Sequence, residues 1–194
     1  MALFAALTAA GAFIRIPAPL GVFTLQLLFT TLAGLLLGAR KGAASVGCYI
    51  VLGLIGLPIF ASGGGIFYVL EPSFGYIIGF AVGAFVTGAI AKSGTPSFLL
   101  NILAAFAGLV AVYVCGMAYN YVICNFYTGA EMGVRMLFLY SFVELPGDIA
   151  LCLAAAAVAE SVTRLLPGLR AAKKRKAEKA KAQKEFLDDN KVER

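Results

Sequence analysis

Residues 97–123 read SFLLNILAAFAGLVAVYVCGMAYNYVI and contain no charged side chain. A helix needs about 20 apolar residues to cross the hydrocarbon core of a bilayer. Five further apolar stretches lie around this one, at about 2–16, 22–39, 42–60, 75–91 and 134–166. Because only helices and closed barrels satisfy every backbone hydrogen bond in lipid, the pattern predicts an all-α integral membrane protein of about six transmembrane helices.

The composition agrees with this prediction and sets the domain boundaries. Hydrophobic residues make up 61% of the chain, charged residues 13%, and the mean hydropathy is +0.90, whereas soluble domains are roughly 45–50% apolar and 25% charged. Six spans account for residues 1–166, which we expect to form one membrane domain. Lysine, arginine, alanine and glutamate dominate residues 167–194, which we expect to form a basic cytoplasmic tail.

The positions of the cations predict the orientation of the chain in a bacterial-type plasma membrane. With both termini in the cytoplasm, 14 of the 16 lysines and arginines lie inside, and only Arg15 and Arg135 lie outside. Cytoplasmic loops of membrane proteins carry an excess of these residues. An even number of spans agrees with this multi-pass arrangement.

The residue types argue against an enzyme. The chain has no histidine, its four cysteines are widely spaced, and no Gly-Lys-Ser/Thr motif follows the glycine-rich stretch. These absences remove the commonest general base, leave no recognisable metal-binding spacing and give no phosphate-binding loop. We therefore expect no catalytic residues, no metal and no cofactor.

Asp148 is the main candidate for a binding role, because ionisable residues inside spans are costly and by default functional. It follows Leu145-Pro146-Gly147, and we expect these residues to interrupt the last span and place Asp148 at a helix N-terminus near the outer face. One interpretation is that the carboxylate only caps that helix. The other is that it accepts hydrogen bonds from N–H groups of a polar solute in a mostly apolar cavity.

Two other features allow both a structural and a functional interpretation. Gly63-Gly64-Gly65, with Tyr76 further on, could let the backbone approach a ligand closely, or could be a flexible connector. Ala2, Ala6 and Ala10 share one face of the first helix, where small side chains let another helix approach. That helix could belong to this chain or to a separate membrane subunit.

Several motifs in order resemble the BioY family, the biotin-binding S components of energy-coupling factor (ECF) transporters. They are Ile16-Pro17, Thr24-Leu25-Gln26, Leu35-Leu36-Leu37-Gly38-Ala39-Arg40-Lys41-Gly42, Gly53-Leu54-Ile55-Gly56-Leu57-Pro58-Ile59-Phe60, Pro72-Ser73-Phe74-Gly75-Tyr76-Ile77-Ile78-Gly79-Phe80 and Leu145-Pro146-Gly147-Asp148. The resemblance covers residues 2 to 166 approximately.

The resemblance implies a six-helix S component that binds biotin and works with an ATP-driven ECF module, made of a transmembrane coupling subunit and two ATPases. Asp148 would accept hydrogen bonds from the ureido ring of biotin, and the stacked alanines would dock on the coupling subunit. Further contacts to the ligand would come from Tyr76, Gln26, Gly64, Ser73 and Gly75.

The sequence also departs from the family pattern. Glu71 and Phe74 replace two glycines, and Leu151 stands where many members carry a lysine. The group that meets the ligand carboxylate is therefore open, with Arg15 and Arg135 as candidates. Alternative functions are a self-sufficient secondary transporter and an S component for a biotin-like vitamin.

Overall fold

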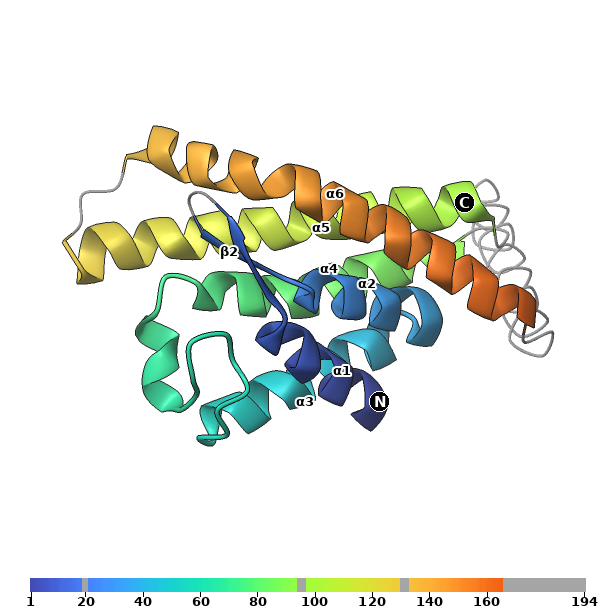
Figure 1. The fold of residues 1–194 in the computed structure, drawn as a ribbon, viewed down its shortest axis with the longest axis horizontal. Coiled ribbons are helices and arrows are strands. Elements are labelled where there is room, and N and C mark those ends of the chain that lie inside the picture. The colour runs from blue at the N-terminus through green and yellow to red at the C-terminus, as the bar shows by residue number, and fades with distance from the viewer. Residues whose placement is uncertain (19–20, 94–96, 130–132, 166–194) are drawn as a thin grey trace, which may run out of the picture.

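The computed structural model describes residues 1–18, 21–93, 97–129 and 133–165 (Figure 1). Six α-helices make up most of this part of the chain. In order, the elements are α1 (Ala2–Phe13), β1 (Arg15–Ala18), β2 (Gly21–Thr24), α2 (Gln26–Leu37), α3 (Ala39–Leu54), the 3-10 helix η1 (Ile66–Leu70), α4 (Phe74–Ser93), α5 (Phe98–Val122), the π-helical turn η2 (Ile123–Tyr127) and α6 (Val134–Leu165). The predicted six-helix, all-α membrane fold is confirmed.

Helix α4 lies at the centre and packs against α5, α2 and α3 (Figure 1). Its contact with α5 is close because Gly79 and Gly83, four residues apart, both face α5. A Cβ atom on Gly79 would lie 2.8 Å from the carbonyl oxygen of Val112, and one on Gly83 would lie 2.6 Å from Cγ2 of the same valine. Small residues let helices in lipid approach until their backbones touch. Any side chain at these positions would push α4 and α5 apart.

The six helices fall into a long set and a short set. The described residues contain three helices that are long and apolar enough to cross a membrane, namely Phe74–Ser93, Phe98–Tyr127 and Val134–Leu165. By contrast, α1 and α2 have 12 residues each and α3 has 16. Twelve helical residues measure about 18 Å, whereas the hydrocarbon core is about 30 Å thick. The first three apolar stretches are therefore only partly helical.

The remainder of those stretches forms a cover at one end of the bundle. Helix α1 ends at Phe13, and strands β1 and β2 then form an antiparallel hairpin in which Arg15 pairs with Thr24. The hairpin was not predicted, because its residues are nearly as apolar as those of a span. After α3, the chain continues as a loop through η1 to the start of α4.

Helix α6 corrects the prediction that the last span is interrupted at Pro146. It runs without a break from Val134 to Leu165, with Pro146 inside it. Proline removes one backbone hydrogen bond, but membrane helices tolerate this because neighbouring groups satisfy the freed carbonyl. Asp148 therefore lies within a continuous helix, and the expectation that it sits at a helix N-terminus is wrong.

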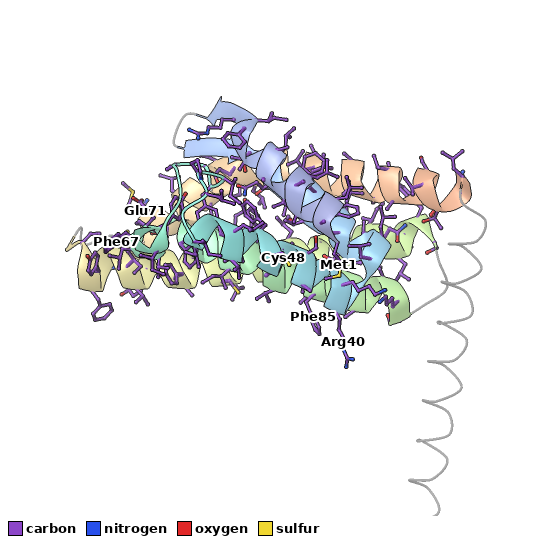
Figure 2. All side chains as sticks on the ribbon, turned by 90° about the horizontal axis from the view of Figure 1, so that it is seen from below. Met1, Arg40, Cys48, Phe67, Glu71 and Phe85 are labelled. Carbon is purple, nitrogen blue, oxygen red and sulfur yellow. The ribbon has the colours of Figure 1, made fainter. Side chains whose placement is uncertain are left out.

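The two ends of the bundle differ in charge. Met1 and Arg40 lie at one end, and Phe67 and Glu71 lie at the other (Figure 2). Lys92 belongs to the first end, since its side chain packs against Gly38 in the turn between α2 and α3. Helix α6 also finishes there (Figure 1). The basic tail at 167–194 lies outside the described residues, and its separation from a domain at 1–166 stays a prediction.

Candidate functional site

A cavity of about 460 Å³ lies beneath the hairpin and the α3–α4 loop. Its walls come from the start of α2, that loop and the facing sides of α4, α5 and α6. The lining residues are Thr24, Gln26, Leu27, Ala61, Ser62, Tyr68, Glu71, Pro72, Ser73, Tyr76, Ile77, Phe80, Val112, Tyr113, Asn120, Leu137, Ser141, Glu144 and Asp148. Small-molecule sites typically have volumes of roughly 300–1,000 Å³, with mostly apolar walls and a few polar groups. This cavity has both properties.

One side of α6 supplies most of the polar wall. Leu137, Ser141, Glu144 and Asp148 are spaced by four, three and four residues, and all of them line the cavity. This spacing places them on one helical face. The stripe continues past Pro146 because the helix does, so the uninterrupted α6 positions two carboxylates on the same wall.

The carboxylate of Asp148 is held by a neighbouring helix. The hydroxyl of Tyr113 on α5 donates to Oδ2 of Asp148 at 2.6 Å. The ring of Tyr113 meets the ring of Tyr76 edge to face, with centroids 6.2 Å apart, and the Tyr76 hydroxyl lies 3.3 Å from Oγ of Ser141. A carboxylate can accept about four hydrogen bonds. Asp148 is therefore oriented by Tyr113 and keeps most of its acceptor capacity for a ligand.

Gln26, at the start of α2, is held in the cavity wall by a chain of hydrogen bonds. Oγ1 of Thr24 donates to Oε1 of Gln26 at 3.2 Å, and Nε2 of Gln26 donates to the hydroxyl of Tyr49 at 2.7 Å. Tyr49 in turn donates to the carbonyl oxygen of Ile59 at 3.2 Å. Gln26 and Tyr49 are both buried. These hydrogen bonds thus link the first turn of α2, through Tyr49 on α3, to the loop that covers the cavity.

Aromatic side chains hold that loop against the helices. Phe60 contacts Tyr49 and Tyr68, with ring centroids 5.4 and 4.6 Å apart, and Phe74 packs edge-on against Phe60 and Tyr119. The hydroxyl of Tyr119 also donates to the carbonyl of Val69. Aromatic pairs of this kind contribute about 0.5–1.5 kcal/mol each beyond area burial. The cover is therefore a packed part of the structure.

The structure places four of the six predicted binding residues in the cavity wall, and these are Asp148, Tyr76, Gln26 and Ser73. Gly64 and Gly75 lie elsewhere. A Cβ atom on Gly64 would meet the carbonyl oxygen of Leu57 at 2.1 Å, and one on Gly75 would meet Cβ of Tyr119 at 2.3 Å. Gly64 allows the loop backbone to pack closely on itself, and Gly75 allows α4 to pack closely on α5. Contact of any of the six with a ligand stays a prediction.

Sequence reasoning did not assign a role to Tyr113, Asn120, Ser141 or Glu144, which also line the cavity. A continuous α6 would have revealed Ser141 and Glu144, because both follow helical spacing back from Asp148. Tyr113 and Asn120 are seven residues apart on α5 and share a face. Their place in the cavity wall depends on how α5 packs against α4 and α6, and local sequence carries no signal for it.

The alanines predicted to dock on a partner lie on the outside of the bundle. Ala2, Ala6 and Ala10 are exposed on α1, while Ala5 and Thr8 on the same helix are buried against the other helices. The small-residue face is thus unoccupied by the described part of this chain. That position agrees with the interpretation in which a separate subunit packs on it.

The chain is similar to known proteins over most of its length. The sequence model of the BioY family matches residues 1–168. The probable biotin transporter BioY of Lysinibacillus sphaericus is 45% identical over 175 residues, which is 89% of each chain. The biotin transporter BioY of Rhizobium etli is 35% identical over 158 residues, covering 76% of this chain and 79% of the relative.

A solved structure shares the fold. It is the crystal structure of the S-component for biotin from an ECF-type ABC transporter, which superposes with a TM-score of 0.72 at 25% sequence identity. The match covers 84% of this chain and 88% of that chain.

Proposed function

This chain belongs to the BioY family, and on that premise we propose that its cavity is the biotin site and Asp148 its principal polar contact. The chain is a membrane-embedded, biotin-binding subunit of an ECF transporter and not an enzyme. Its contribution is therefore binding energy rather than chemistry. The four lining residues predicted from the sequence, together with Tyr113, would form the polar part of the site.

The observation that carries this proposal is the carboxylate of Asp148, oriented by Tyr113 in a mostly apolar cavity. The ureido ring of biotin has two N–H donors and one carbonyl, and its thiophane ring is apolar. An oriented carboxylate suits the N–H donors, because hydrogen bonds to charged groups contribute about 1.5–3 kcal/mol. Tyr76, Ile77 and Phe80 offer aromatic and apolar surface for the thiophane ring.

We also propose the subunits with which the chain works. They are a transmembrane coupling subunit, docked on Ala2, Ala6 and Ala10, and two cytoplasmic ATPases. No phosphate-binding motif occurs in this sequence, which agrees with ATP being used by partner subunits alone. The chain itself would need no cofactor.

The proposed orientation places both termini in the cytoplasm and the cavity at the outer face. Arg40, Lys41 and Lys92 belong to the end of the bundle opposite the cavity (Figure 2). Arg15 begins strand β1 of the hairpin, and Arg135 lies on the first turn of α6, so both belong to the cavity end. The excess of cations at the first end supports its location in the cytoplasm. Biotin would then enter from outside, beneath the hairpin and loop.

A ligand screen on the purified chain tests the proposal. We expect biotin to bind with nanomolar to low micromolar affinity, dethiobiotin to bind more weakly, and unrelated vitamins not to bind. Reconstitution in liposomes then tests the partners, since uptake of labelled biotin should require the coupling subunit, the ATPases and ATP. Failure to bind biotin would refute the ligand assignment, and concentrative uptake by the isolated chain on an ion gradient would favour a secondary transporter.

A further inference from the structure

The charged residues in the cavity wall raise a question about the one charged group of the ligand, its carboxylate. Glu71, Glu144 and Asp148 line the cavity, and no lysine or arginine does so among the described residues. Biotin carries a carboxylate at the end of its tail, which like charges on α6 would repel. The tail must therefore point away from the acidic stripe of α6.

We propose that Arg15, on the first strand of the hairpin, binds the carboxylate of the ligand. This inference rests on the proposed function, because it assigns the second half of the same ligand. Arg15 pairs directly with Thr24 in the antiparallel hairpin. Directly opposed side chains in such a pair project from the same face, with Cβ atoms about 5 Å apart.

The orientation of Thr24 indicates which face that is. Thr24 lines the cavity, and its hydroxyl donates to the side chain of Gln26 in the same wall. Arg15 therefore projects from the face of the hairpin that looks over the cavity. Its position, just after α1 and beside the start of α2, is on the hairpin's base and not on α6, where the acidic stripe lies.

Arg15 is also available for a ligand. The residue is exposed, and among the residues that the structure describes it makes no ion pair. A guanidinium presents several donors in a planar fork that matches a carboxylate. Ligand binding would supply the anion that this side chain lacks.

Arg135, the other cation at this end of the bundle, does not share this geometry. It lies on the first turn of α6, roughly 120–180° around the helix from each member of the stripe at Leu137, Ser141, Glu144 and Asp148, at about 100° per residue. Its side chain thus points away from the cavity wall. We expect it to contribute little to binding.

The experiment compares two ligands and three variants in the purified full-length chain, produced without biotin. The ligands are biotin and biotinamide, in which a neutral amide replaces the carboxylate. We expect Arg15→Gln to weaken biotin binding by about 10- to 100-fold, the range for a hydrogen bond to a charged group. Binding of biotinamide should stay within about twofold of wild type. Arg15→Lys should recover most of the biotin affinity, and Arg135→Gln should change neither ligand.

Each other result has a distinct meaning. The proposal is overturned if Arg15→Gln binds biotin normally, if it loses both ligands equally, or if Arg135→Gln is the variant that weakens biotin. Equal affinity of the wild type for biotin and biotinamide would also overturn it, while leaving biotin as the ligand. Binding of neither ligand by the wild type would refute the proposed function as well.

Discussion

Tyr113 and Asp148 form the central polar contact of the cavity, and each depends on the other. The hydroxyl of Tyr113 gives the carboxylate one strong donor within a low-dielectric wall. Such a bond orients the acceptor and stabilises its charge. Asp148, which we propose binds the ligand, is thus positioned by a residue that comes from a different helix.

Substitution of Tyr113 by phenylalanine tests that dependence. Removing the hydroxyl takes away a hydrogen bond to a charged group, which is worth about 1.5–3 kcal/mol, and leaves the carboxylate less well oriented. We expect biotin affinity to fall about tenfold, measured by calorimetric titration. Tyr121→Phe is the matched control, because Tyr121 lies on the same helix but does not line the cavity. Equal affinities for the two variants would contradict the role of Tyr113.

Tyr49 makes a second residue-scale prediction through its buried hydroxyl. Tyr49→Phe removes the acceptor for Nε2 of Gln26 and the donor to the carbonyl of Ile59. Leaving buried groups unsatisfied costs about 1–3 kcal/mol, so we expect a lower unfolding temperature and weaker biotin binding. Tyr127→Phe, at an exposed tyrosine, should change neither. An unchanged Tyr49→Phe protein would show that the polar chain does not support the site.

At the scale of elements, the close contact of α4 with α5 depends on glycine. Gly79→Ala would place a Cβ atom 2.8 Å from a backbone carbonyl of Val112, and overpacking of this kind costs about 1–3 kcal/mol. We expect a clear loss of thermal stability in detergent. Gly47→Ala in α3 is the control, since nothing lies within 4 Å of its Cβ position. Equal stability of the two variants would mean that α4 and α5 can move apart without cost.

The exposed face of α1 gives a prediction about docking. Ala6→Leu adds bulk to the small-residue face that we propose for the coupling subunit, so ATP-driven uptake of biotin should fall at least severalfold. Biotin binding by the isolated chain should be unchanged, because Ala6 is outside the cavity. Val110→Leu, at an exposed position of α5, should support normal uptake. Normal uptake by Ala6→Leu would move the docking surface elsewhere.

Hydropathy predicted the helices well but not where they end. The stretches at 75–91, 97–123 and 134–166 correspond to α4, α5 and α6. The hairpin was missed because Ile16, Val22 and Phe23 are as apolar as residues of a span. Pro146 was misread as a break because proline disrupts soluble helices more than membrane helices.

Sequence alone identified those residues of the candidate site whose side chains are unusual within a membrane helix. Asp148 was found because a charge within a span is costly. Tyr113 was not found, since tyrosine is ordinary in such helices and its partner is 35 residues away. Contacts between helices depend on their packing, which a single sequence does not show.

At the scale of the whole molecule, the division into short and long helices explains how a six-helix bundle forms a cavity. At the cavity end, α1 and α3 stop and α2 starts within the bundle, whereas α5 and α6 extend further (Figure 1). The hairpin and the α3–α4 loop lie at this end of the short helices. The opposite end carries Arg40 and Lys41, on the first turn of α3. We propose that the cavity end binds the ligand and that the opposite end faces the cytoplasm.

The central claim is that this cavity binds biotin through Asp148. Equilibrium titration of the purified chain with labelled biotin tests it most directly, with Asp148→Ala compared with wild type and with Glu160→Gln, an acid on α6 outside the cavity. We expect nanomolar to low micromolar affinity for wild type and Glu160→Gln, and no measurable binding for a folded Asp148→Ala protein. Undiminished binding of biotin by Asp148→Ala would contradict the account.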